Sequence, residues 1–182
     1  MMKDKGINTD GLWKSPDRMT TNKIRIISRS QQMLRLDREI ATDLETDAAD
    51  RFIQKTIDLF VLQQPDIVIF EDYNKGVLTA AVIRSLIAWC RQHGVLMSVD
   101  PKRKNFFEYT GVDIFKPNLK EAREALGFLD NKPTLENLKT IHHLLHAKLG
   151  HHLSFITLSE AGVFYQHDEE AVHLPAFVRN IA

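Results

Sequence analysis

The fold is decided by the stretch Asp66-Ile67-Val68-Ile69-Phe70-Glu71-Asp72-Tyr73-Asn74-Lys75-Gly76, which joins a short apolar segment to a polar one. The same pattern recurs at residues 95–99, which run into Asp100-Pro101-Lys102-Arg103-Lys104. Between these segments, residues 79–93 carry apolar side chains at helical spacing, so the order predicts strand, helix, strand. Ligands of open α/β sheets bind at the carboxyl ends of the strands, and the polar residues after each strand are therefore the first site candidates.

Outside this unit, apolar spacing and cap residues predict further strands and helices. Helices are expected at residues 47–62, 118–126 and 134–149, and strands at residues 112–115, 153–157, 162–166 and 171–174. Such alternation implies right-handed crossovers and helices on both faces of the sheet. We therefore predict an α/β fold with a mostly parallel sheet in a three-layer α/β/α arrangement.

Residues 20–37 show a different pattern, in which apolar and polar side chains alternate around a polar turn. Ile24 and Ile26 fall on one face of this segment. The alternation predicts a small antiparallel hairpin that forms a lid. We assign residues 18–39 to this β lid and residues 47–182 to the α/β core of a single domain that spans residues 1–182.

Composition restricts the class of partner. The chain has 182 residues, of which 43% are hydrophobic, and its 24 Lys and Arg balance its 24 Asp and Glu. No net charge therefore favours nucleic acid or an anionic membrane. The single cysteine, Cys90, excludes an internal disulfide and fits a buried, inert thiol. A reduced thiol of this kind fits a cytoplasmic location. Because no apolar run approaches the ~20 residues that a membrane helix needs, we expect a soluble protein with no membrane partner.

Several short motifs occur in an order that is specific as a set. They are Thr20-Thr21-Asn22-Lys23 with Arg25, the run Ser28-Arg29-Ser30-Gln31-Gln32 leading to Arg35-Leu36-Asp37, Asp72-Tyr73 with Lys75-Gly76, Asp100-Pro101-Lys102, and Pro117-Asn118-Leu119-Lys120-Glu121. On these motifs the chain resembles the ribokinase-like carbohydrate kinases, and more closely the bacterial heptose-7-phosphate kinase domain of ADP-heptose and lipopolysaccharide precursor synthesis. The resemblance implies a ribokinase-like fold and a cytoplasmic sugar kinase that uses ATP and Mg²⁺.

The chain departs from the pattern of that family at both ends. Family members begin with a sheet portion that carries a Gly-Gly substrate motif. After the equivalent of Asn180-Ile181-Ala182 they continue into an Asp-x-x-Gly-Ala-Gly-Asp segment with the anion hole and the catalytic aspartate. Neither motif occurs in this sequence. We therefore expect an incomplete kinase domain, assign no catalytic residue, and expect the chain to be inactive by itself.

The resemblance also implies a nucleotide site. The Asn-x-x-Glu motif, which comprises Asn118, Leu119, Lys120 and Glu121, points to ATP and, through Glu121, to its metal. The run from Thr157 to Gly162 is similar to the segment that approaches the nucleotide, and Thr157, Ser159 and Gly162 are its candidate residues. Spacing alone leaves an alternative open, because Asn118 and Glu121 also fit a plain capping box at the start of a helix.

Candidate substrate residues are Asp72, Lys75, Gly76, Lys102 and Arg25. Asp72 is suited to accept hydrogen bonds from sugar hydroxyls, and Lys75 is suited to neutralise a sugar phosphate. Gly76 permits a close backbone approach to a ligand. The alternative for this segment is an Asx-type turn with Lys75 in solvent. Lys102 is directed back over the strand ends by Pro101, whereas Arg103 and Lys104 fit a solvated charge run.

The lid supports two interpretations. The lid cations could clamp a phosphosugar, because arginine forks match phosphate oxygens; these candidates are Lys23, Arg25, Arg29 and Arg35. The same cations could instead pair with residues 37–39 of a second copy, and an exposed hairpin edge favours a homodimer through the lid. We expect the histidines at positions 142, 143, 146, 151 and 152 to lie in solvent rather than to bind a metal.

Three functions therefore remain in view. The leading one is an ATP-dependent sugar kinase that converts heptose 7-phosphate to the 1,7-bisphosphate. A second keeps the fold and changes the sugar. The third is a non-catalytic chain that binds nucleotide or associates with itself.

Overall fold

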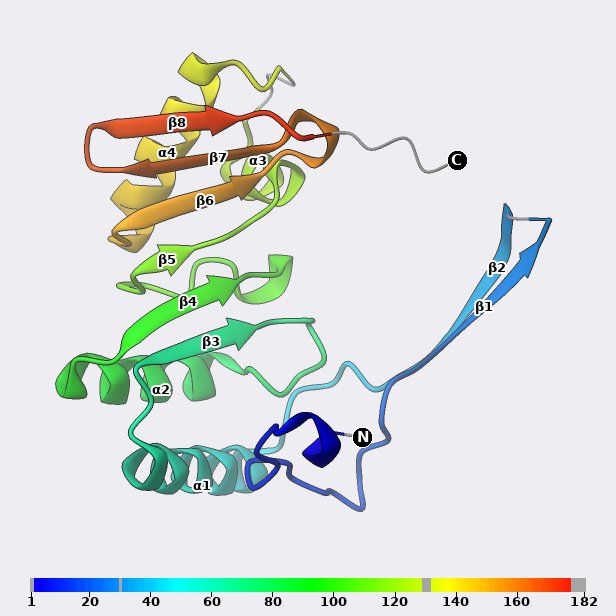
Figure 1. The fold of residues 1–182 in the computed structure, drawn as a ribbon. Helices are drawn as coiled ribbons and strands as arrows, with labels where there is room; N and C mark the ends of the chain where they lie inside the picture. The colour runs from blue at the N-terminus through cyan, green and yellow to red at the C-terminus, as the bar shows by residue number, and fades with distance from the viewer. Residues whose placement is uncertain (1, 30, 129–131, 178–182) are drawn as a thin grey trace.

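The computed structural model describes residues 2–29, 31–128 and 132–177, and Figure 1 shows its main feature, a six-stranded sheet. The strands lie in the order of the sequence: β3 (Ile67–Glu71), β4 (Leu96–Asp100), β5 (Ile114–Phe115), β6 (Leu153–Thr157), β7 (Val163–His167) and β8 (Glu170–Leu174). β3 to β6 are parallel, and β7 and β8 add to the edge in antiparallel fashion. The predicted α/β class with a mostly parallel sheet is confirmed.

The helices begin and end at the residues that local chemistry favours. They are α1 (Thr46–Gln63), α2 (Ala80–His93), α3 (Leu119–Leu126) and α4 (Leu135–Leu149), with short 3₁₀ turns η1 (Lys3–Lys5), η2 (Arg103–Asn105) and η3 (Ser159–Ala161). Thr79, Asn118 and Thr134 each accept a hydrogen bond from a first-turn N–H of the helix that follows. A glycine with positive φ follows each of these three helices.

The helices pack on one face of the sheet. Met97, Val99, Phe115, Ile156 and Phe164 point to that face and are each at most 2% exposed. In Figure 1, α3 and α4 lie behind β6 to β8, and no helix crosses the front of the sheet. Within the described residues, the second helical layer of the expected three-layer arrangement therefore has no counterpart. Apolar residues of the front face consequently stay exposed, namely Ile67 at 41%, Ile69 at 59% and Leu96 at 54%.

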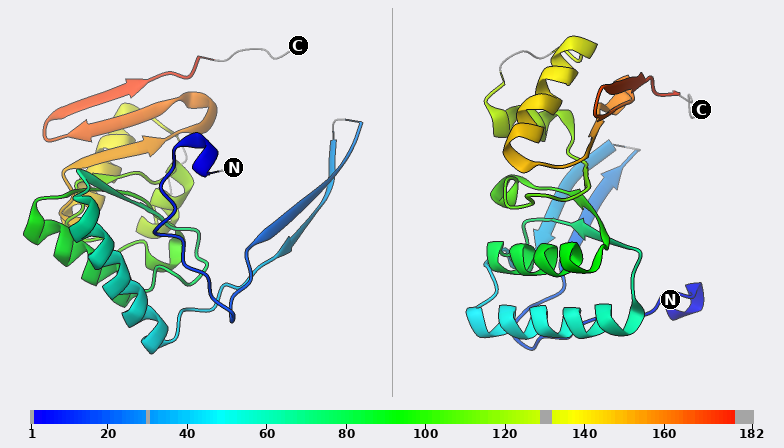
Figure 2. Two further views of the ribbon diagram at one scale, coloured as in Figure 1. Left: turned by 60° about the horizontal axis from the view of Figure 1, so that its bottom comes forward. Right: turned by 90° about the vertical axis from the view of Figure 1, so that its left-hand side faces the viewer.

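The predicted lid is an antiparallel hairpin of β1 (Asn22–Ser28) and β2 (Gln31–Arg38), and it projects from the α/β body (Figure 1 and the left view of Figure 2). Of the lid motif residues, Ser30 lies outside the described residues, as does the segment Asn180-Ile181-Ala182 at the end of the chain. Pairing sorts the side chains by chemistry. The apolar pairs Ile24–Leu36 and Ile26–Leu34 alternate with the charged pairs Lys23–Asp37 and Arg25–Arg35. The lid therefore has one apolar and one charged face.

The buried histidines correct one expectation. His142 is 3% exposed and His151 is 0% exposed, so these two do not lie in solvent. Both bond to the buried Ser154 hydroxyl, from His142 Nδ1 at 2.9 Å and from His151 Nε2 at 2.6 Å. Histidines at helical spacing on α4 are typical both of a solvated helix face and of a buried polar cluster between α4 and β6. Sequence alone does not distinguish these two arrangements. Burial, reinforced by the neighbouring histidines, lowers the pKa of His142 to about 4 and that of His151 to about 3.

Two further findings concern the chain as a whole. Cys90 is buried as expected, and burial with the nearby Asp113 raises the pKa of its thiol to about 11. The thiol is therefore protonated at neutral pH and unreactive. Among the helices of the described residues, none combines the length and the apolar character that crossing a membrane requires.

Candidate functional site

Parallel pairing brings the carboxyl ends of four strands to one edge of the sheet. The register pairs Glu71 of β3 with Asp100 of β4, and the Lys116 N–H that follows β5 donates to Val99 O at 2.8 Å. The residues after β5 and β6 also meet, because Asn118 forms a parallel bridge with Thr157. The polar segments that the sequence placed after separate strands are therefore neighbours, as the strand-end rule predicts.

An ion-pair network links three of these segments. Lys102 Nζ lies 2.6 Å from Glu121 Oε1 and 3.2 Å from Asp100 Oδ1, and Lys116 Nζ lies 2.6 Å from Asp100 Oδ2. Partial burial alone would lower the pKa of Lys102, but its bonds to Glu121 and Asp100 outweigh burial and raise it. Burial would likewise raise the pKa of Asp100, and the two lysines together lower it instead. Lys102 and Asp100 are therefore both charged at neutral pH.

Asn118 and Glu121 form a complete capping box at the start of α3. The Glu121 N–H donates to Asn118 Oδ1 at 2.8 Å, and the Asn118 N–H donates to Glu121 Oε2 at 3.0 Å. The capping alternative that spacing left open is thus present. Glu121 does more than cap, however, because its other oxygen accepts the Lys102 ammonium. A role for Glu121 toward a metal remains a prediction.

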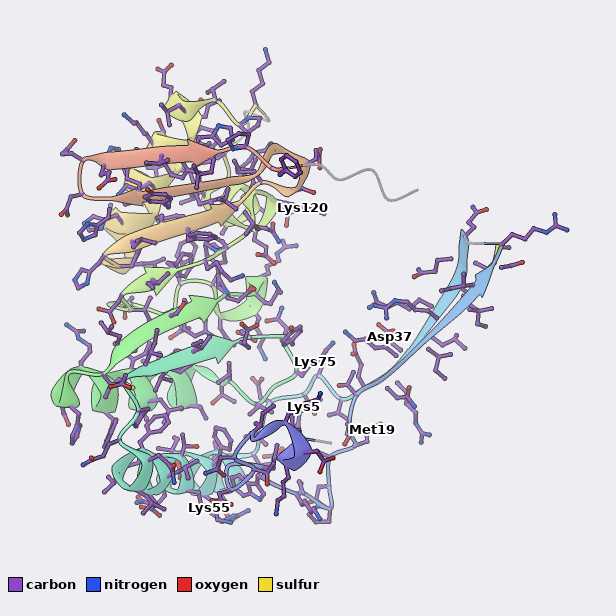
Figure 3. All side chains as sticks on the ribbon, in the orientation of Figure 1. Lys5, Met19, Asp37, Lys55, Lys75 and Lys120 are labelled. Carbon is purple, nitrogen blue, oxygen red and sulfur yellow. The ribbon has the colours of Figure 1, made fainter. Side chains whose placement is uncertain are left out.

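The other two residues of the Asn-x-x-Glu motif point elsewhere. Leu119 is half-buried against the apolar core. The Lys120 side chain is 82% exposed and lies 3.8 Å from Glu124 one turn along α3. It is labelled in Figure 3 and is available to solvent rather than held in the ion-pair network. Contact of either residue with ATP remains a prediction.

The segment after β6 folds tightly beside Asn118. The Thr157 N–H donates to Pro117 O at 3.1 Å, and η3 follows with Ser159 at a φ of 56°. Gly162 has a φ of 98°, and a Cβ built on it would lie 2.0 Å from Leu174 O. The close approach that requires glycine here is therefore to the chain's own backbone after β8, and contact of Gly162 with a nucleotide remains a prediction.

A groove of about 350 Å³ lies at the end of β3, between this strand and the base of the lid. Its lining comprises Thr21, Lys23, Glu71, Asp72, Tyr73, Lys75, Val77 and Leu78. Figure 3 shows Lys75 in the loop after β3, on the side of the lid. Arg25 does not line the groove; it lies farther along the lid, opposite Arg35. Lys23 takes the position at the groove that Arg25 was expected to hold.

Asp72 is 3% exposed, and both of its carboxylate oxygens have partners within the chain. Oδ1 accepts the Asn74 N–H at 2.8 Å, and Oδ2 accepts the Tyr109 hydroxyl at 2.8 Å. Burial and the Asp72 carboxylate raise the pKa of Tyr109, which keeps that hydroxyl a donor. The geometry is the Asx-type turn of the alternative interpretation. Binding of a sugar hydroxyl to Asp72 stays a prediction and would have to compete with these bonds.

Lys75 and Gly76 also have partners in the chain. Lys75 Nζ lies 2.5 Å from Glu39 Oε1, so Lys75 is paired rather than free in solvent. A Cβ built on Gly76 would lie 1.9 Å from Thr42 O, and the Leu44 N–H donates to Gly76 O at 2.8 Å. The absence of a side chain at Gly76 thus lets the segment that joins lid and core pack closely, and ligand approach at Gly76 remains a prediction.

The geometry also places at the site two residues to which the sequence assigned no site role, Lys116 and, as the partner of Lys75, Glu39. Lys116 directly follows β5, so the strand-end rule that selected Asp72 also selects it. Glu39 has no such signal, because only the folded lid brings it to Lys75.

Asp100 and Glu121 supply the hard carboxylate oxygens that Mg²⁺ prefers. Among the described residues, no group of three or more His, Cys, Asp or Glu side chains is placed to hold a metal ion. A divalent ion here would therefore need oxygens from its ligand as well, which matches the way Mg²⁺ commonly bridges one or two carboxylates and substrate phosphates.

The fold and the candidate site define an α/β protein with charged side chains gathered at the carboxyl ends of its strands, and comparison with known proteins gives its family. A model of the pfkB family of carbohydrate kinases matches residues 1–181. The chain belongs to this family.

Two relatives are called bifunctional protein HldE. The protein of Campylobacter fetus is 35% identical over 181 residues and that of Helicobacter pylori 33% identical over 187 residues. These matches cover 100% and 99% of this chain, and the chain spans 38% of the length of each relative.

Solved structures show the same fold. The ribokinase of Giardia lamblia matches 98% of this chain and 54% of its own with a TM-score of 0.71 and 15% identity. Phosphofructokinase-2 from Escherichia coli in complex with fructose-6-phosphate matches 88% of this chain and 52% of its own with a TM-score of 0.66 and 14% identity. The expected ribokinase-like fold is thus confirmed.

Proposed function

We propose that this chain forms the nucleotide end and part of the phosphosugar site of an ATP-dependent sugar kinase whose substrate is heptose 7-phosphate. The observation that carries the proposal is the meeting of Asn118, Thr157 and the Lys102–Asp100–Lys116 network at one edge of the sheet. The choice of sugar rests on the motif resemblance and on the HldE relatives, and the product would be the 1,7-bisphosphate.

ATP and Mg²⁺ are the proposed cofactors. Bound Mg²⁺ would neutralise charge on the nucleotide phosphates, with Glu121 and Asp100 as its nearest carboxylates. Lys102 and Lys116 supply cationic donors at the same edge, and such donors match phosphate oxygens. The Thr157–Gly162 segment lies beside them, because Thr157 forms a bridge with Asn118.

The groove under the lid is the proposed phosphosugar site. Lys23 and Lys75 both line it and bring two positive charges from the lid and from the loop after β3. Lys75 is paired with Glu39, so a dianionic 7-phosphate would have to displace that carboxylate to gain both charges. Since Lys23 belongs to the charged face of the hairpin, that face is directed to the groove at its base.

The opposite face of the lid suits a second copy of the chain. Ile24, Ile26, Leu34 and Leu36 are each 46–51% exposed on this one face. An apolar two-stranded sheet with free edges favours pairing with another copy. A homodimer through the lid is therefore part of the proposal, and the cytoplasm is the compartment proposed for an ATP-dependent enzyme of sugar metabolism.

Calorimetric titration tests the substrate. We expect the chain to bind heptose 7-phosphate at least tenfold more tightly than heptose, because the phosphate meets Lys23 and Lys75. A Lys23→Ala variant should lose most of that preference. The control is Lys55→Ala, which changes a lysine of α1 that lies over the Trp13 ring, and it should keep the preference. Equal affinity for both sugars would contradict the proposed substrate.

An ADP-release assay with heptose 7-phosphate tests the reaction itself. Binding of MgATP and phosphosugar with no ADP release would favour the alternative of a nucleotide-binding chain without catalysis. Turnover that disappears in a Glu121→Ala variant would support catalysis by the chain alone and would contradict the expectation of inactivity.

A further inference from the structure

Lys102 places its ammonium between two carboxylates from different strand ends. Nζ lies 2.6 Å from Glu121 Oε1 and 3.2 Å from Asp100 Oδ1. Both carboxylate side chains are mostly shielded, with 16% of Glu121 and 24% of Asp100 exposed. A cation is therefore already present at the point where the two oxygen donors converge.

The four oxygens of these carboxylates each accept a donor from the chain. Asp100 uses Oδ1 for Lys102 and Oδ2 for Lys116, and Glu121 uses Oε1 for Lys102 and Oε2 for the Asn118 N–H. Two lysines and two carboxylates make the cluster neutral. A divalent ion that entered without an anion would create a net charge of 2+ and would have to displace an ammonium from a shielded pair, which is costly.

We propose that Lys102 holds the cation position between Asp100 and Glu121 and excludes a free divalent ion until a polyphosphate draws the ammonium away. This inference rests on the proposed function, because that function supplies the polyphosphate and the ion. Negatively charged phosphate oxygens can replace the two carboxylates as partners of the Lys102 ammonium. Glu121 and Asp100 are then free to face the metal. Metal and nucleotide then bind with positive coupling, and neither ligand loads the site efficiently alone.

The test uses Mn²⁺ as probe and contains no nucleotide. The intact chain should show no saturable Mn²⁺ binding at millimolar concentration by electron paramagnetic resonance. Lys102→Met should gain affinity by at least tenfold, because two adjacent carboxylates lose their shared cation. Lys102→Arg should behave like the unaltered chain.

Lys116→Met is the matched control. It also removes one positive charge from the cluster, but the Lys116 ammonium contacts Asp100 alone and not Glu121. Its gain should be at least fivefold smaller than that of Lys102→Met. Equal gains in both variants, or no gain in a folded Lys102→Met protein, would overturn the role of Lys102. Circular dichroism and thermal unfolding establish that each variant is folded.

The outcome is distinguishable from failure of the proposed function. If the unaltered chain does not bind MgATP while Lys102→Met gains Mn²⁺ affinity, the kinase proposal fails and the exclusion of free cations holds. If MgATP binds and Lys102→Met gains no Mn²⁺ affinity, only the inference about Lys102 fails.

Discussion

At the scale of single residues, the candidate site and the fold share their side chains. Asn118 and Glu121 begin α3, and Asp72 fixes the turn after β3, yet the same residues face the ligand edge of the sheet. A substitution at any of them should therefore change stability as well as the proposed binding. Affinity measurements on such variants therefore need a stability measurement beside them.

Asp72→Ala should lower the free energy of unfolding by about 2–4 kcal/mol, because it leaves the buried Tyr109 hydroxyl and the Asn74 N–H without an acceptor. Urea unfolding measures the effect. Asp66→Ala, at the exposed opposite end of β3, should change it by less than about 0.5 kcal/mol. Equal effects at the two positions would contradict the structural role of Asp72.

At the scale of elements, two glycines show why the site was only partly predictable. Glycine after a strand suggested ligand approach, but at Gly76 and Gly162 the neighbour is the chain's own backbone. Sequence shows that a position needs glycine and does not show which atoms come close. The strand and helix positions, by contrast, follow from apolar spacing and caps, and the observed elements lie within two residues of the predicted ones.

Gly76→Ala and Gly94→Ala form a matched pair. Their φ angles are +73° and +67°, so both substitutions carry the same strain of roughly 1 kcal/mol. Only at Gly76 would the new Cβ collide with Thr42 O, and it should therefore cost at least about 2 kcal/mol more than Gly94→Ala in urea unfolding. Similar costs would show that the lid connection is free to move away from the loop after β3.

The lid was predictable as an element, because alternation and a polar turn determine a hairpin locally. The ion pairs that the lid forms were not predictable from the sequence. Glu39 pairs with Lys75, and Arg35 donates to Asp37 at 2.8 Å on the same strand. Such pairings depend on how the lid leaves the core, which no local pattern encodes.

At the scale of the whole molecule, the uneven distribution of exposed apolar groups favours association. Ile26→Lys combined with Leu34→Lys places two charges on the apolar face of the lid and should convert a dimer into a monomer. Light scattering after size exclusion measures the mass. The control is Ile69→Lys, on the exposed face of the six-stranded sheet, and it should leave the dimer intact. If only this control dissociates the dimer, the interface lies on the sheet and not on the lid.

The buried histidines make stability depend on pH. Their pKa values in the folded chain, about 4 for His142 and about 3 for His151, lie below the unfolded value of 6.5. The unfolded chain therefore binds more protons below pH 6.5, and stability that is complete above this pH is lost as the pH falls toward 4. We expect unfolding free energy to drop by about 2–4 kcal/mol between pH 7.5 and pH 5. A constant value over this range would contradict the burial of both rings.

The central claim is that Asn118 and the strand ends beside it form a nucleotide site, and MgATP calorimetry on Asn118→Ala tests it most directly. The control is Thr134→Ala, which removes the corresponding cap of α4, a residue with no part in the Lys102–Asp100–Lys116 network. Each variant should lose about 1 kcal/mol of stability. We predict that Asn118→Ala weakens MgATP binding at least tenfold while Thr134→Ala keeps the affinity of the unaltered chain. Unchanged MgATP affinity in Asn118→Ala would contradict the account and leave Asn118 with its capping role alone.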